Sequence, residues 1–175
     1  MKEIVQYIIG YIIGITIFLY LIPFGLYEVS KLNYLIGNVV LIKLTIPRII
    51  ISFIIFLIGI WFAIWSNIFL FIRGKGGPAD AFGISISPRT KKLVTSGPYR
   101  YSRNPMVFGA FSIYISVAVF LNSIIDLIFL FVFLFIGIVY LKLSEEKRLL
   151  KDFGDEYIEY KKKVSMIFPL KWLRR

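Results

Sequence analysis

The chain has 175 residues, a length typical of one domain, and we expect residues 1–175 to form a single domain. Hydrophobic residues make up 58% of it, aromatic residues 18%, and its mean hydropathy is +0.80. Ordinary soluble domains are roughly 45–50% apolar, so the composition excludes a soluble globular protein. The formal charge of +11 comes from residues beside long apolar stretches, where anionic lipid headgroups are nearer than nucleic acid. We therefore expect the lipid bilayer, and no nucleic acid, as a partner.

Cysteine and histidine are both absent from the chain. Their absence excludes disulfide scaffolds, thiolate zinc sites, cysteine nucleophiles and the commonest general base and metal ligand. We expect no metal site, and any chemistry must proceed without these side chains.

Two uncharged stretches, residues 4–27 and 49–72, predict two transmembrane helices. Each exceeds the 20 or so residues that cross a bilayer core of about 30 Å. The first apolar run is too long for a secretory signal and has only Lys2 before it, so we interpret it as a retained span.

A third apolar stretch, residues 106–141, is too long for a single crossing. As one helix it would measure about 54 Å at roughly 1.5 Å per residue. We therefore predict a helical hairpin of two short arms, turning at Asn122 and Ser123. Ser123 and Asp126 have the spacing of a capping box, which would start the second arm.

The distribution of Lys and Arg predicts the orientation in the membrane. Seven lie in residues 73–103 and ten from Lys142 onward, whereas the turn at 122–123 has none. The positive-inside rule then places both termini and the basic loop in the cytoplasm, with four spans. Residues 32–44 are apolar but interrupted by Asn38 and Lys43, so they are either an interfacial segment, which we favour, or a fifth crossing.

Two cytoplasmic segments carry the side chains suited to ligand binding. Residues 91–105 combine bends at Gly97, Pro98 and Pro105 with tyrosines, arginines and Asn104, although such a segment can also be a simple interfacial anchor. After the last span, Glu145 and Glu146 need cationic partners, which could be Lys142, Lys147 or a bound ligand. Gly154 is predicted to end this helix, and Asp155 to begin another.

These two segments and the hairpin between them resemble the isoprenylcysteine carboxyl methyltransferase and phospholipid methyltransferase superfamily. The resemblance covers residues 74–169, with LVTSGPYRYSRNP before the hairpin and SEEKRLLKDFGDEYIEYKKKVSMIFP after it. The family's R-H-P-x-Y signature has Asn104 in place of its His and Val107 in place of its Tyr, and the R-N-P form resembles a prokaryotic branch.

The resemblance implies an all-α polytopic membrane bundle with an S-adenosylmethionine site at the cytoplasmic mouth of the hairpin. It places Arg103 and Asn104 at the catalytic centre. The implied cofactor-binding residues are Leu93, Val94, Gly97, Tyr99, Tyr101, Arg103, Asn104, Pro105, Glu145 and Glu146. A glutamate would pair with the ammonium of the methionine moiety, and donors near Arg103 would hold its carboxylate.

The acceptor implied by the resemblance is a membrane lipid or a prenylated small molecule. A carboxylate acceptor is already ionised and needs no base, which favours O-methylation of an isoprenylcysteine-like substrate in a chain without histidine. Two other interpretations remain open: an NADPH-dependent membrane sterol or lipid reductase, whose cofactor phosphates would suit the basic loop, and a lipid-binding protein without catalysis. The sequence does not indicate an oligomeric state.

Overall fold

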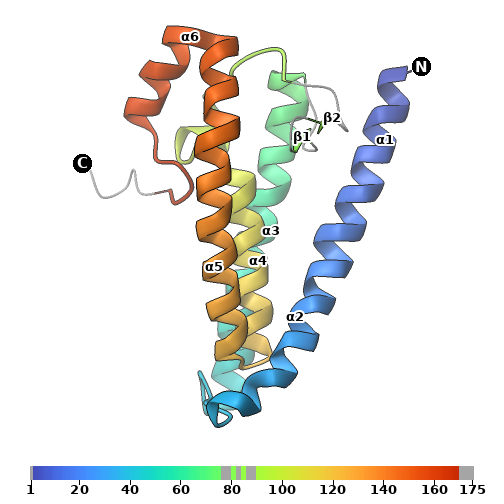
Figure 1. Ribbon diagram of the computed structural model, residues 1–175, viewed down its shortest axis with the longest axis vertical. Helices are drawn as coiled ribbons and strands as arrows, with labels where there is room; N and C mark the ends of the chain where they lie inside the picture. The colour runs from blue at the N-terminus through green and yellow to red at the C-terminus, as the bar shows by residue number, and fades with distance from the viewer. Residues whose placement is uncertain (1, 76–79, 82–83, 86–89, 170–175) are drawn as a thin grey trace.

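The computed structural model describes the whole chain except residues 1, 76–79, 82–83, 86–89 and 170–175. It confirms an all-helical membrane bundle (Figure 1). Three continuous helical segments are long and apolar enough to cross a bilayer, namely residues Ile8–Ile36, Thr45–Gly74 and Ile124–Lys163, and Pro105–Phe120 is a shorter apolar helix.

The first helical segment runs from Lys2 to Ile36. It consists of α1 (Lys2–Ile15), the π-helical turn η1 (Thr16–Leu21), α2 (Ile22–Ser30) and the 3₁₀ turn η2 (Lys31–Ile36). Pro23 follows the π-helical turn, as expected where a proline removes a backbone donor and the helix must widen. The segment ends at Gly37, which has a φ of 75°.

Residues 32–44 do not form a fifth crossing. Their first part completes η2, and residues 37–44 are not helical. The loop is instead fixed by Asn122, whose Oδ1 accepts hydrogen bonds from the backbone N–H groups of Leu41 and Ile42 at 2.9 and 3.0 Å. This segment therefore connects two spans at one end of the bundle.

The second crossing is α3 (Thr45–Phe69), which continues through the π-helical turn η3 (Leu70–Gly74). Pro47 lies in its first turn, where a missing N–H costs no helical hydrogen bond. Beyond η3, the two-residue strands β1 (Asp80–Ala81) and β2 (Ile84–Ser85) pair antiparallel, and the 3₁₀ turn η4 (Gly97–Arg100) precedes the hairpin. Most of residues 74–83, the opening of the family resemblance, lies outside the described residues.

The predicted hairpin is confirmed. Its arms are α4 (Pro105–Phe120) and α5 (Ile124–Tyr140), of 16 and 17 residues, with Asn122 in the left-handed conformation at the turn. Ser123 caps α5 as expected, because its Oγ accepts from the N–H of Asp126 at 3.2 Å. The Asp126 carboxylate is fully buried and has no hydrogen-bond partner among the described residues.

The last segment leaves the bilayer as one helix and then kinks. α5 continues through the π-helical turn η5 (Leu141–Glu145) into α6 (Glu146–Lys163). Within α6, Gly154 has φ 51° and ψ −127°, so the chain bends at the glycine that was predicted to end the helix. The second half of α6 is thereby turned back toward the bundle.

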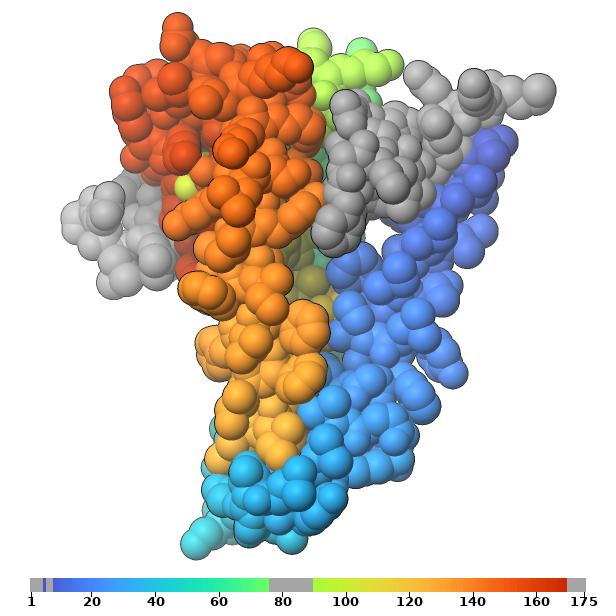
Figure 2. Space-filling model, in the orientation of Figure 1, coloured from blue at the N-terminus to red at the C-terminus, as the bar shows by residue number. Residues whose placement is uncertain are grey.

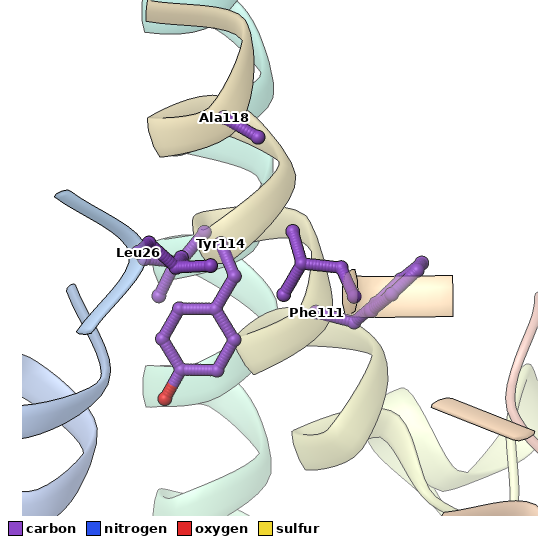
Figure 3. Close-up of a cluster of buried hydrophobic side chains, with 6 residues drawn as sticks. Leu26, Phe111, Tyr114 and Ala118 are labelled. Carbon is purple, nitrogen blue, oxygen red and sulfur yellow. The ribbon is translucent and has the colours of Figure 1, made fainter. Parts of the chain in front are cut away.

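The bundle is held together mainly by α3 and α4. A Cβ atom on Gly59 of α3 would lie 2.8 Å from the carbonyl oxygen of Gly109 on α4, so the two backbones approach as closely as small residues allow. Next to this crossing, a buried cluster gathers side chains from α2, α4 and α5 (Figure 3); it comprises Leu26, Phe111, Ile113, Tyr114, Ala118 and Leu130. α1 stands away from the other helices, whereas α2 approaches them (Figure 1).

The two ends of the bundle differ in what they carry. The space-filling view shows α6 over one end and residues 31–44 at the other (Figure 2). The start of α1 and the end of α3 lie toward the α6 end (Figure 1). The start of α1, the end of α3 and α6 thus share one end of the molecule.

Candidate functional site

A cavity of about 230 Å³ lies where the segment before α4 meets the start of α6. Its lining combines charged and aromatic side chains with apolar ones. The lining residues are Leu70, Thr90, Lys92, Leu93, Val94, Tyr99, Arg103, Asn104, Pro105, Met106, Val107, Tyr140, Leu141, Glu145, Glu146, Arg148, Leu149, Phe153, Tyr157 and Tyr160.

A buried ion pair joins the two sequence segments across this cavity. Nη1 of Arg103 lies 2.5 Å from Oε1 of Glu146, and both side chains are about nine-tenths buried, with exposed fractions of 10% and 9%. The other carboxylate oxygen, Oε2, lies 2.6 Å from Nζ of Lys161. Nη1 of Arg103 also donates to the hydroxyl of Tyr157 at 3.3 Å. Two motifs 43 residues apart in the sequence therefore meet at one carboxylate.

The position of Arg103 is determined by the chain beyond α6. The backbone N–H of Arg103 donates to the carbonyl of Ser165 at 2.9 Å, and that of Asn104 donates to Met166 at 3.0 Å. The side-chain amide of Asn104 donates to the same Met166 carbonyl, also at 3.0 Å. Asn104 thus uses its side chain to hold the turn before α4 against the C-terminal segment.

The position of Glu146 depends on the π-helical turn η5. A π turn adds a residue to the helix and rotates the residues that follow it, and such turns are frequent at functional sites. η5 ends at Glu145, and Glu146 is buried while Lys147 is exposed. The wider turn therefore precedes the residue whose carboxylate faces Arg103.

The neighbouring acid, Glu145, has a different partner. Its Oε2 lies 2.7 Å from Nη2 of Arg148, and Nη1 of Arg148 lies 3.4 Å from Asp152. The sequence suggested Lys142, Lys147 or a bound ligand as partners of the acid pair, and the two lysines are not the partners that the structure shows. The structure corrects this expectation, because the cations that meet the two glutamates come from Arg103, Arg148 and Lys161.

Tyr99 and Tyr160 connect η4 to α6 beneath the cavity. The Tyr160 hydroxyl donates to the backbone carbonyl of Tyr99 at 2.7 Å, and both residues are buried. Burial raises the pKa of the Tyr99 phenol above its ordinary value, so the hydroxyl stays protonated at neutral pH. Tyr99 can therefore serve as a hydrogen-bond donor or an aromatic surface, and not as a base.

Most of the candidate residues lie together around the cavity. Those that line it are Leu93, Val94, Tyr99, Arg103, Asn104, Pro105, Glu145 and Glu146. Gly97 and Tyr101 are not among the lining residues. A Cβ atom at Gly97 would clash with the ring of Phe69, and the Tyr101 ring lies 6.3 Å from the Trp65 ring, so both residues face α3.

Sequence reasoning missed the contribution of the second half of α6. Tyr157, Tyr160 and Lys161 complete the charged end of the cavity, although the segment was interpreted only as a helix with its charges matched to the helix dipole. The available signal was the pair of aromatic residues three apart in a strongly charged helix, which indicates a buried face.

The cavity has unmet hydrogen-bonding capacity. Nε of Arg103 is buried and, within the part of the chain that the structure describes, has no hydrogen-bond partner. Buried donors are normally satisfied, so this N–H has hydrogen-bonding capacity that no described residue uses. Within the same described residues, no three His, Cys, Asp or Glu side chains group as a metal ion would require.

A comparison with family models relates this arrangement to known proteins. Residues 47–156, more than half of the chain, match the phospholipid methyltransferase model, and this range contains most of α3 and the hairpin with the Arg103–Glu146 pair. No curated protein and no solved structure matches the chain. The match to the family model shows that the chain belongs to the phospholipid methyltransferase family, within the isoprenylcysteine and phospholipid methyltransferase superfamily.

Proposed function

We propose that this membrane methyltransferase transfers a methyl group from S-adenosylmethionine to a lipid-borne or prenylated acceptor at the cavity. The observation that carries the proposal is the buried Arg103–Glu146 pair, which presents a cation and an anion side by side. The methionine moiety of the donor carries an ammonium and a carboxylate that match these two charges. Family membership supports methyl transfer over the reductase interpretation.

The residues present fit the donor in charge and polarity. The Glu146 carboxylate would hold the ammonium, and the unpaired Nε of Arg103 would donate to the carboxylate. Leu93, Val94 and Tyr99 offer apolar and aromatic surface for the adenine ring. When bound, S-adenosylmethionine supplies an electrophilic methyl group on a sulfonium.

The work left to the protein is alignment and exclusion of water. Correct positioning of two reactants contributes roughly 7–11 kcal/mol to lowering a barrier. Arg103 would orient the donor, while Asn104, whose amide is bonded to Met166, would hold the turn that carries Arg103. Tyr157 and Tyr160, both buried, would keep water from the charged end of the cavity.

An anionic acceptor suits the charges around the cavity. Three cations, Lys92, Arg103 and Arg148, line it against two acids, Glu145 and Glu146, and Lys161 adds a further positive charge at Glu146. A carboxylate is attracted by this excess and is already ionised, whereas an amine is repelled and must lose a proton. We therefore favour O-methylation of an isoprenylcysteine-like carboxylate.

The apolar part of the lining suits an acceptor that arrives from the bilayer. Leu70, Met106, Val107 and Leu141 lie at the ends of the spanning helices α3, α4 and α5. Val107 stands where the family signature has a tyrosine, so the wall offers aliphatic contact at that position. A prenyl or acyl chain could lie along these side chains with its headgroup beside Arg103.

Binding of S-adenosylhomocysteine to the detergent-solubilised protein tests the proposal. We expect Glu146→Gln to weaken binding at least tenfold, because the ammonium loses its charged partner. The matched control is Glu159→Gln on the exposed face of α6, where the carboxylate pairs with Lys162 and Lys163, and it should bind as the wild type does. Label should pass from methyl-labelled S-adenosylmethionine into a prenyl-cysteine analogue or membrane lipid.

The proposal is wrong if the wild-type protein binds no S-adenosylhomocysteine, or if Glu146→Gln binds it as tightly as the wild type. Binding of NADPH instead would support the reductase interpretation. Because Glu146→Gln leaves Arg103 without its counterion, unfolding of each variant is measured in parallel, and Glu146→Asp, which keeps the charge, should retain part of the affinity.

A further inference from the structure

The carboxylate of Glu146 is shared by two cations that differ in their surroundings. Arg103 contacts Oε1 with only 10% of its side chain exposed. Lys161 contacts Oε2 with 50% of its side chain exposed. Arg103 is therefore a buried partner of Glu146, and Lys161 is a half-exposed one.

Arg103 is fixed by several further bonds. Its backbone N–H donates to Ser165, and its Nη1 also donates to Tyr157, which is 2% exposed. Moving Arg103 would break these bonds and leave a buried carboxylate and a buried guanidinium without partners, which is strongly unfavourable. Arg103 is therefore expected to stay in place when a ligand binds.

Lys161 can leave at much lower cost. It lies in the last turn of α6, and its ammonium can be solvated by water as soon as it moves away from Glu146. Water therefore replaces much of the interaction that Lys161 loses when it leaves.

We propose that Lys161 is an internal substitute for the ammonium group of the methyl donor. Its Nζ holds Oε2 of Glu146, the atom that the donor's ammonium would take, and the donor must displace it to bind. This inference rests on the proposed function. It assigns to Lys161 the role of a residue that lowers donor affinity and keeps Glu146 paired whenever the donor has left.

If the donor must displace Lys161, removing the Lys161 charge should change the affinity only for ligands that carry an ammonium. A ligand that competes with an internal group binds more weakly, in proportion to the fraction of the protein in which that group has left. Lys161→Met keeps most of the side-chain stem and removes the competing charge. It should strengthen the binding of ligands that carry an ammonium and leave others unchanged.

The matched control is Lys162→Met. Lys162 is the next residue, its side chain is 65% exposed, and it pairs with Glu159 at 2.8 Å instead of with Glu146. This substitution removes the same charge from the same turn of α6. A general effect of net charge on ligand affinity will therefore appear in both Lys161→Met and Lys162→Met. A difference in affinity between the two variants will report the displacement of Lys161.

The experiment measures two ligands against the wild-type protein, Lys161→Met, Lys162→Met and Lys161→Arg by calorimetry in detergent. S-adenosylhomocysteine carries the ammonium, and 5′-methylthioadenosine has the nucleoside and thioether without it. We expect Lys161→Met to bind S-adenosylhomocysteine about fivefold more tightly than the wild type. Its affinity for 5′-methylthioadenosine should not change, and Lys162→Met and Lys161→Arg should resemble the wild type with both ligands.

Equal or weaker binding of S-adenosylhomocysteine to Lys161→Met overturns the inference, and weaker binding would assign Lys161 to the ligand's carboxylate. A gain of the same size with both ligands also overturns it, because the effect would then not concern the ammonium. If Lys161→Met does not fold, Lys161→Gln takes its place with the same expectations. Failure of the proposed function would give a different result from failure of this inference, since the wild-type protein would then bind neither ligand.

Discussion

At the scale of single residues, the site is held by hydrogen bonds between segments that are distant in the sequence. The Tyr160 hydroxyl reaches the Tyr99 carbonyl across 61 residues, and Asn104 reaches Met166 across 62. The first bond gives the Tyr99 carbonyl a donor, and the second adds a side-chain donor to a Met166 carbonyl that already accepts from the backbone N–H of Asn104. The cavity therefore depends on a few polar side chains as well as on apolar packing.

Tyr160→Phe tests this dependence. The substitution leaves the Tyr99 carbonyl without its donor, and we expect the free energy of unfolding to fall by about 1–3 kcal/mol. S-adenosylhomocysteine binding should weaken too, since Tyr99 lines the cavity. Chemical unfolding in detergent measures the first effect, with Tyr34→Phe, a 61% exposed tyrosine of η2, as the control. If Tyr160→Phe and Tyr34→Phe unfold at the same denaturant concentration, the bond from Tyr160 to the Tyr99 carbonyl does not stabilise the protein.

At the scale of helices, the α3–α4 contact is the most extensive among the described elements, and it rests on glycine. A Cβ at Gly109 would lie 2.7 Å from the backbone nitrogen of Ala63, and a Cβ at Gly59 would lie 2.7 Å from Ile113 Cγ1. Within a bilayer, packing of this kind replaces the hydrophobic effect as the force between helices. Since Arg103 lies two residues before α4 begins and Leu70 follows the last residue of α3, the crossing positions two sides of the cavity.

Gly59→Ala should therefore destabilise the protein, by about 1–3 kcal/mol, because the added methyl group meets backbone atoms that cannot move aside. Gly137→Ala is the control, since a Cβ there has nothing within 4 Å and alanine favours the helix. Thermal inactivation of S-adenosylhomocysteine binding in detergent compares the two. Destabilisation by both substitutions to the same extent would show that the close approach at Gly59 is unimportant.

At the scale of the whole molecule, the arrangement of the ends agrees with the charge distribution of the sequence. The basic segments that flank the cavity lie at the α6 end, and residues 37–44 and the turn at 121–123 lie at the other. The positive-inside rule assigns the α6 end to the cytoplasm. We propose this orientation, with both termini and the cavity on the cytoplasmic side.

The absence of cysteine makes the orientation directly measurable. Val40→Cys, in the loop after η2, should react with a membrane-impermeant thiol reagent added to intact cells. Glu156→Cys, on the exposed face of α6, should react only after permeabilisation. Labelling of Glu156→Cys alone in intact cells would reverse the proposed topology.

The membrane spans and the hairpin followed from the sequence because their signals are local. An uncharged run of bilayer length, a turn at Asn122 and a cap at Ser123 each depend on neighbouring residues, and the structure confirms them. Gly154 was identified for the same reason, since a glycine in a charged helix marks a place where the backbone can leave helical geometry.

The sequence by itself also determined the two motifs, since Arg103 and Glu146 stand out as charged residues beside apolar spans. Only the tertiary structure decided which cations meet the acid pair, because Arg103 and Lys161 are 43 and 15 residues from Glu146 and no local rule relates them. The π-helical turn η5, the docking of Ser165 and Met166, and the side to which Tyr101 turns were likewise decided by packing. Partners that are distant in the sequence meet only when helices cross and a kinked helix folds back, and this follows from the sum of many contacts across the bundle.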